Sequence, residues 1–113
     1  MAVSFQGLQE TCVTFKTEGV VETGDIVKMY ANGTVKLCDL GDQIVGVVKS
    51  ARAGYASVQI HGAVTLSYTG NAPGLGWRTV DADDAGGVSL SSTGRNVLIV
   101  SVDSAAHTLT MIF

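Results

Sequence analysis

Short apolar runs recur about every 8–12 residues along the chain, and clusters of Gly, Asn, Asp and Ser separate them. Fourteen glycines and one proline supply many of the turn residues between these runs. Within residues 11–16, apolar and polar side chains alternate, so every second side chain shares one face of a strand. No segment shows the capped i, i+3, i+4 spacing of an amphipathic helix. This rhythm predicts an all-β fold, a single small β-barrel or β-sandwich-like domain with short strands.

The dipeptide Asn32-Gly33 is the strongest local hairpin signal, because both residues tolerate the positive φ of tight turns. It predicts a return strand over residues 34–38. The alternation after the turn places Val35 and Leu37 on the core-facing side of that strand.

Two runs in the middle of the chain predict further strands. Residues 43–50 are almost continuously apolar, which indicates a strand buried on both faces. Residues 56–60 and 63–68 are separated by a glycine, and this pattern fits one long strand with a bulge at Gly62.

The second half predicts a short strand over residues 77–80 and a closing hairpin over residues 95–103 and 108–113. The glycine-rich residues 69–76 and the acidic residues 81–87 predict loops. Because the final strand ends at the C-terminus, we expect that terminus to be held by pairing.

The strand pattern begins at Thr11, so we divide the chain into an N-terminal arm, residues 1–10, and a β domain, residues 11–113. The first segment lacks strong alternation, and two interpretations of it stay open. It is either an extended arm reaching up to about 33 Å or an ordinary edge strand through Val3 and Phe5.

Charge argues against a nucleic-acid partner. The formal net charge is −3, and the seven Lys and Arg residues are scattered along the sequence. Nucleic-acid binding generally needs a basic patch. Only 15% of residues are charged, against roughly 25% in an average globular protein. A surface with so few charges either exposes small polar residues or is covered by a partner. The second possibility favours an assembly protein.

Nothing in the sequence predicts contact with a membrane. No apolar run approaches the ~20 residues needed to cross a bilayer, and the first residues do not resemble a secretory signal. We therefore expect synthesis in the reducing cytoplasm. Cys12 and Cys38 are too few for a disulfide scaffold or a Cys-based zinc site. They are free thiols or, if their strands are neighbours, a disulfide.

No set of residues predicts catalysis. His61 lies in a glycine-bounded junction and His107 lies in a turn, and neither belongs to a recognised catalytic motif. Nothing near either cysteine supplies the positive charge that would activate a thiol. The glycines form neither a phosphate loop nor a dinucleotide fingerprint. We expect no enzymatic activity and no cofactor.

The acidic loop is the one candidate metal site. Asp81, Asp83 and Asp84 precede a Gly pair in a way that resembles a calcium loop. The rest of the twelve-residue calcium pattern, including its terminal Glu, is missing, and Ca²⁺ prefers about six to eight oxygen ligands. We therefore expect a solvated turn and no metal.

Trp77 is the candidate partner anchor, because it follows a flexible, glycine-rich loop. The alternative is core packing, since large aromatic side chains are mostly buried. If Trp77 and Tyr68 were both exposed, they would form the stacking platform of a carbohydrate-binding module.

Three segments together resemble the small bacteriophage head decoration (cement) proteins. They are residues 23–27 (TGDIV), 44–48 (IVGVV) and 58–66 (VQIHGAVTL), followed by the closing hairpin. The resemblance covers residues 20–113, and its motifs are glycines and alternating apolar residues.

The resemblance implies a structural protein of the virion that binds the major capsid protein on the outer capsid surface and stabilises the head. Such proteins are often homotrimers, and their N-terminal arms commonly add a strand to the capsid protein. Here Val3, Phe5 and Leu8 would be the anchors of that capsid-binding arm. The alternatives are another phage structural component, such as a head-fibre base or tail accessory, and a small carbohydrate-binding β module.

Overall fold

All regular structure in residues 10–113, the part of the chain that this computed structural model describes, is β-strand. The predicted arm anchors Val3, Phe5 and Leu8 lie outside the described residues. No helix in residues 10–113 could span a bilayer. The strands are β1 (Thr11–Thr17), β2 (Ile26–Ala31), β3 (Thr34–Leu37), β4 (Gly46–Arg52), β5 (Tyr55–His61), β6 (Ala63–Ser67), β7 (Gly76–Ala82), β8 (Val88–Leu90), β9 (Arg95–Asp103) and β10 (Thr108–Ile112).

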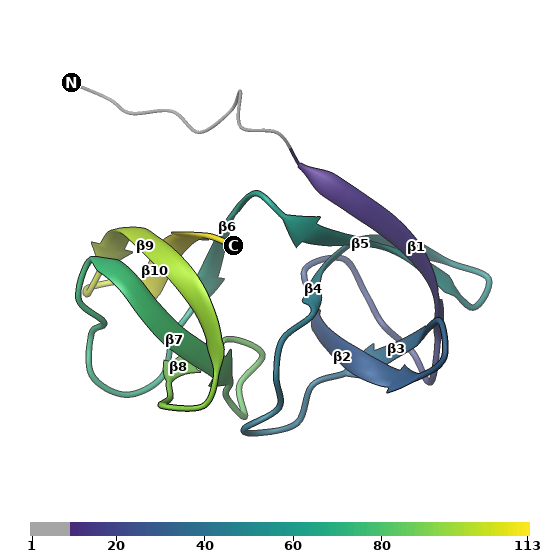
Figure 1. Cartoon of the computed structure of the whole chain (residues 1–113), viewed down its shortest axis with the longest axis horizontal. Coiled ribbons are helices and arrows are strands. Elements are labelled where there is room, and N and C mark those ends of the chain that lie inside the picture. The colour runs from purple at the N-terminus through teal and green to yellow at the C-terminus, as the bar shows by residue number, and fades with distance from the viewer. Residues whose placement is uncertain (1–9) are drawn as a thin grey trace.

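The first five strands close into a barrel with the order β1-β3-β2-β4-β5 (Figure 1). Strand β1 closes it by pairing antiparallel with β5 and parallel with β3. Branched side chains fit the narrow interior because they pack well on a pleated surface. The fully buried interior valines are Val27, Val35, Val48 and Val58.

The last five strands form a second sheet with the order β6-β10-β9-β7-β8, in which every neighbouring pair is antiparallel. A parallel bridge between Tyr68 and Val88 brings the two edges of this sheet together at one end. The sheet therefore curls around its own apolar face (Figure 1).

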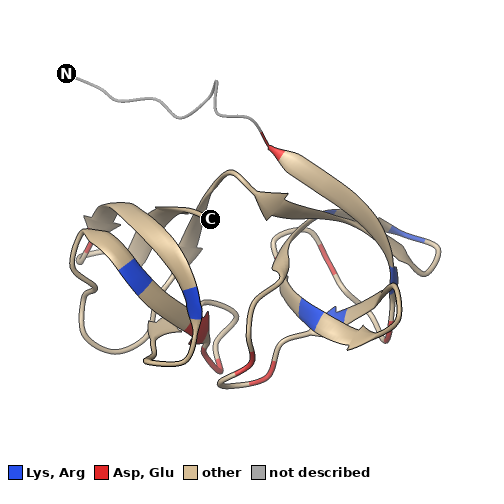
Figure 2. Ribbon diagram, viewed as in Figure 1, with Lys and Arg blue, Asp and Glu red and all other residues tan. Residues whose placement is uncertain are grey.

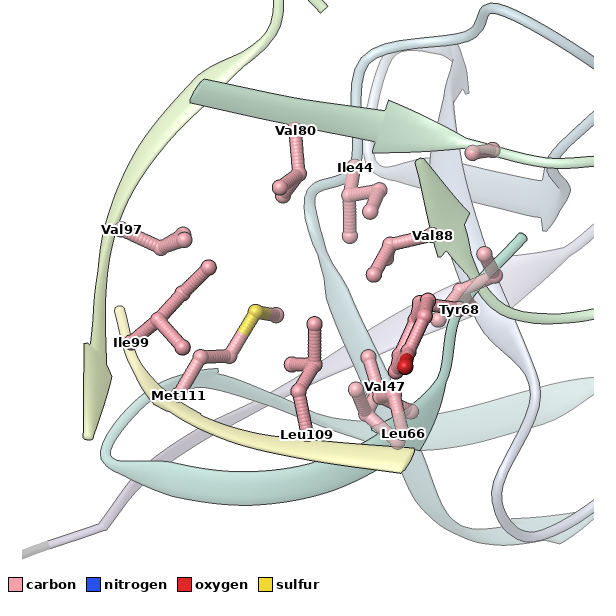
Figure 3. Packing of buried hydrophobic residues seen from close by; sticks show 12 residues of the cluster. Ile44, Val47, Leu66, Tyr68, Val80, Val88, Val97, Ile99, Leu109 and Met111 are labelled. Atoms are coloured by element: carbon pink, nitrogen blue, oxygen red, sulfur yellow. The ribbon is translucent and has the colours of Figure 1, made fainter. Parts of the chain in front are cut away.

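One hydrophobic cluster joins the two sheets (Figure 3). Ile26, Ile44 and Val47 come from the barrel side and pack with buried residues of the second sheet. Within β4, Val47 belongs to this shared cluster, whereas Val48 belongs to the barrel interior. The predicted burial of residues 43–50 on two faces is confirmed within the strand only over residues 46–48, because the strand begins at Gly46 and is exposed from Lys49 onward.

The expected long strand with a bulge at Gly62 is wrong. Strand β5 belongs to the barrel and β6 belongs to the second sheet, and Gly62 is the step between them. Its φ of 121° is a conformation that L side chains rarely adopt. Glycine therefore permits the change of direction that takes the chain from one sheet into the other.

The Asn32-Gly33 hairpin between β2 and β3 is confirmed, with Gly33 at a φ of 63°. Val35 is fully buried, as expected, but Leu37 is 43% exposed. The return strand ends at Leu37, opposite the fully buried Val27.

The closing hairpin is confirmed as β9 and β10, and the C-terminus is held as predicted. Phe113 and Gly62 exchange two backbone hydrogen bonds, of 3.1 and 3.2 Å. The strand expected over residues 77–80 is longer than predicted, because β7 continues to Ala82 by pairing with β8.

Candidate partner-binding face

The outer face of the second sheet carries an apolar row that crosses four strands. Trp77 of β7 lies opposite Leu98 of β9, which lies opposite Ile112 of β10. Ile112 in turn lies opposite Ala63 of β6. Because side chains alternate along strands, these four point away from the buried neighbours Ile99 and Met111. We call Trp77, Leu98, Ile112 and Ala63 the outer row.

Trp77 is 63% exposed, and the other three members of the outer row are half-buried. Leu75, two residues earlier, is also exposed. The structure thus places the predicted anchor on the surface and excludes its packing in the core. An exposed Trp among further apolar side chains is typical of a binding surface.

Beside the outer row lies a group of hydroxyl side chains. Ser101 lies opposite Thr110, and Thr110 lies opposite Thr65. The hydroxyls of Thr65 and Thr110 are 2.9 Å apart and hydrogen-bonded. A surface of hydroxyl and apolar groups is inexpensive to desolvate compared with one of ions.

The second aromatic residue needed for a sugar platform is not available. Tyr68 is 5% exposed and belongs to the shared hydrophobic cluster, where its ring lies 5.5 Å from that of His107. Trp77 and Tyr68 therefore cannot present two rings to a carbohydrate.

The acidic loop is the solvated turn that the sequence predicts only over residues 84–86, which are exposed, whereas Asp83 is buried. Asp83 is 4% exposed, and its carboxylate accepts hydrogen bonds from the backbone N–H groups of Ala85 and Gly87, each at 2.8 Å. It also accepts one from the hydroxyl of Thr69 at 2.6 Å. Asp81 lies in β7, and Asp84 is exposed. Across residues 10–113, no three His, Cys, Asp or Glu side chains are grouped to hold a metal ion.

The histidines and cysteines have separate surroundings. The ring Nδ1 of His61 lies 3.3 Å from the carbonyl oxygen of Phe113. Both cysteines are free, Cys12 exposed and Cys38 partly buried. Burial raises the pKa of the Cys38 thiol to about 12, and the nearby Asp42 adds to this effect.

Lys28 and Asp42 form the closest ion pair in the described part of the chain, with 2.6 Å between Nζ and Oδ2. Asp39 lies farther from the same Nζ, at 3.7 Å, and its backbone N–H donates to Asp42. The hydrogen bond between Lys28 and Asp42 raises the pKa of the lysine and lowers the pKa of the aspartate. This cluster fixes the turn before β4.

Arg95 is the residue of greatest structural consequence that the sequence did not single out. Its guanidinium donates to the backbone carbonyls of Val45 at 2.6 Å and Ile60 at 2.9 Å, both on the barrel side. Its charged group also lies over the ring of Phe113, 4.8 Å from the centroid. Burial lowers the pKa of this arginine. Only the pairing of the two sheets, which no local pattern encodes, brings these partners together.

The other basic residues do not gather into a patch. In Figure 2 the Lys and Arg positions are spread over strands of both sheets. Lys28 and Lys49 already lie within ion-pair distance of acidic groups. The described surface therefore offers no basic stripe of the kind that follows a phosphate backbone.

A comparison with models of known protein families found no match to this chain. Comparisons with curated protein sequences and with solved structures also found none.

Proposed function

We propose that this chain is a bacteriophage head decoration protein, which binds the outer surface of an assembled capsid and stabilises it. The proposal begins from the sequence resemblance over residues 20–113. The observation that carries it furthest is the outer row, in which Trp77 is exposed beside further apolar side chains on the outer face of the second sheet. Such an exposed apolar row is suited to pack against another protein.

The physical effect of such a protein follows from mass action. Each copy that binds the assembled capsid, and not the separated subunits, stabilises the assembled form by RT ln(1 + [L]/Kd). At a concentration of 100 Kd this amounts to about 2.7 kcal/mol per site. A copy that bridges neighbouring subunits therefore raises the temperature at which the capsid opens.

Co-sedimentation with emptied, expanded capsids built from the major capsid protein of the same phage tests the proposal. We expect saturable binding at a fixed ratio to the capsid subunit, together with a rise in capsid melting temperature. Absence of binding to those capsids would overturn the proposal and direct attention to a fibre or tail component.

Two substitutions test whether the outer row makes the contact. Trp77→Ala removes the anchor and should weaken capsid binding by at least about tenfold, the loss typical of an aromatic hot spot. Tyr30→Ala is the matched control, because Tyr30 is a 54% exposed aromatic residue on the barrel. Equal loss in both variants, or in neither, would remove the outer row from the interface.

A further inference from the structure

We propose that the free edge of β6, where it borders the barrel, accepts an extended segment of the capsid subunit as an added strand. The inference rests on the proposed function for the identity of the partner. Its physical basis is the free backbone of β6 and the crevice beside it, and it reverses the direction of the expected arm contact. In this contact the chain receives a strand.

The pairing of β6 with β10 shows which backbone groups face the free edge. Gly62 and Phe113 exchange two hydrogen bonds, and the N–H of Tyr68 donates to the carbonyl of His107. In an antiparallel pair, hydrogen-bonded positions alternate. Ala63, Thr65 and Ser67 therefore turn their N–H and C=O groups away from β10, toward the free edge.

Along this edge, the outward carbonyls of Ala63 and Ser67 already have neighbours within the chain, whereas the outward backbone groups of Thr65 do not. The carbonyl of Ala63 accepts a hydrogen bond of 3.2 Å from the Gln59 side chain. The carbonyl of Ser67 lies against Gly87, where an added Cβ would come within 2.2 Å of it. No described strand pairs with β6 on this side of Thr65. A free N–H and C=O of one residue are what an added strand needs to form a pair of hydrogen bonds.

A crevice of about 300 Å³ lies along this edge. One wall is β6, and the other is formed by β4 together with the turn before β2. The crevice has room for a few residues of a single extended chain. Its lining residues are Thr23, Gly24, Val47, Val48, Lys49, Gln59, Ala63, Val64, Thr65 and Leu66.

Gln59 lines the crevice and carries a buried polar atom without a hydrogen-bond partner. The residue is completely buried, and its amide nitrogen donates hydrogen bonds to the carbonyls of His61 and Ala63. Its Oε1 is a buried acceptor with no donor among residues 10–113. Buried acceptors in native proteins are nearly always paired. A donor carried by an inserted segment would satisfy this oxygen as the crevice walls adjust to it.

The charge of the crevice lining and the continuity of the crevice with the outer row indicate which kind of segment would bind. Lys49 is the one charged residue in the described lining, so a segment with a carboxylate beside it is favoured. Glu10 lies 3.8 Å from Lys49 at a half-exposed position, and a better-placed partner carboxylate can compete with this contact. Ala63 belongs both to the crevice and to the outer row. A capsid surface seated on the row can therefore send a strand directly into the crevice.

The edge also lacks the features that usually prevent strand addition. Exposed edges in monomeric proteins carry charged side chains, proline or a bulge. The sequence of β6 is AVTLS, without charge or proline, and its pairing with β10 is regular from Ala63 to Ser67. The sequence of β6 therefore does not oppose strand addition at Thr65.

The test is capsid co-sedimentation with two variants of the full chain. Thr65→Pro removes the outward N–H but leaves the ladder to β10, because proline is tolerated where an edge N–H faces outward. We expect capsid binding to fall at least about tenfold. Thr65→Val keeps the N–H and loses the hydroxyl, as the proline variant also does, so it should bind capsids at least about tenfold more tightly than Thr65→Pro.

Hydrogen exchange on the unaltered chain gives a second readout that does not depend on how the proline variant folds. The Thr65 amide should exchange rapidly in the free protein and become protected on the capsid. Unaltered Thr65 exchange, or full binding by a folded Thr65→Pro variant, would overturn the strand addition while leaving the decoration role intact. If the unaltered chain fails to bind capsids at all, the proposed function falls and this assignment of the partner falls with it.

Discussion

Arg95 shows how one side chain can hold two sheets together. Its guanidinium supplies donors to backbone carbonyls of the barrel from a strand of the second sheet. Arg95→Met keeps much of the apolar stem and leaves those carbonyls without their donor. We expect the free energy of unfolding to fall by about 2–4 kcal/mol, the combined cost of several unmade hydrogen bonds. Guanidinium denaturation measures it.

Arg78 provides the control for that substitution. It lies on β7 of the same sheet, is exposed, and donates only to the carbonyl of its neighbour Trp77. Arg78→Met should change stability by less than about 0.5 kcal/mol. If the two arginine variants lose the same amount, Arg95 does not join the sheets energetically.

The two cysteines should differ in reactivity because of their surroundings. Thiolates react and thiols do not, and burial holds the pKa of Cys38 at about 12. At pH 8, a thiol reagent should therefore modify the exposed Cys12 quickly in the folded protein and Cys38 only after unfolding. Cys12→Ser should abolish the fast phase in a colorimetric assay. A fast phase that survives in Cys12→Ser would show that Cys38 is accessible.

At the scale of elements, the turn between β3 and β4 depends on a carboxylate. The pKa of Asp42 is lowered first by its hydrogen bond with Lys28 and then by the Asp39 backbone N–H. A carboxyl whose folded pKa is depressed stabilises the fold above its ordinary pKa, and this contribution is lost as pH falls through the folded value. Lys28 stays charged throughout that acidic range, because its own pKa is raised.

Asp42→Asn should therefore flatten the acid dependence of stability. Between about pH 5 and pH 2, the free energy of unfolding of the unaltered chain should fall more steeply than that of the variant. Lys28→Gln removes the same pair from the other side and should flatten the curve in a similar way. Chemical denaturation at a series of pH values measures this, and parallel curves for the three proteins would contradict it.

The strands themselves were largely readable from the sequence, because each depends on local alternation and turn chemistry. The failures occur where an element depends on a distant neighbour. In the sequence, residues 63–68 look like a continuation of residues 56–60, yet Gly62 sends the chain into another sheet. Leu37 has the correct phase for burial but is 43% exposed at the end of its strand. Local alternation contains neither fact.

The candidate site divides in the same way. An exposed Trp77 could be suggested from the loop before it, but the outer row could not, because Leu98, Ile112 and Ala63 join it only through register across four strands. The free edge at Thr65 and the unpaired Gln59 oxygen likewise appear only when both sheets are placed. Asp83 was expected in a solvated turn and is buried.

At the scale of the whole molecule, the shared hydrophobic cluster should make the two sheets unfold together. Val47 lies on β4 of the barrel but packs in the same cluster as Leu109 and Met111 of the second sheet. Trp77, the only tryptophan, reports on the second sheet. A fluorophore on exposed Cys12, in a Cys38→Ser background, reports on the barrel. The two probes should give coincident guanidinium transitions.

Val47→Ala distinguishes this cooperative behaviour from two sheets that unfold independently. It removes buried methyl groups from the shared cluster, so both probes should shift together, by about 1–3 kcal/mol. Val20→Ala is the control, because Val20 is 80% exposed and its loss should move neither transition appreciably. If only the barrel probe shifts in Val47→Ala, the sheets are separate folding units, and the cluster between them is a contact surface and not a common core.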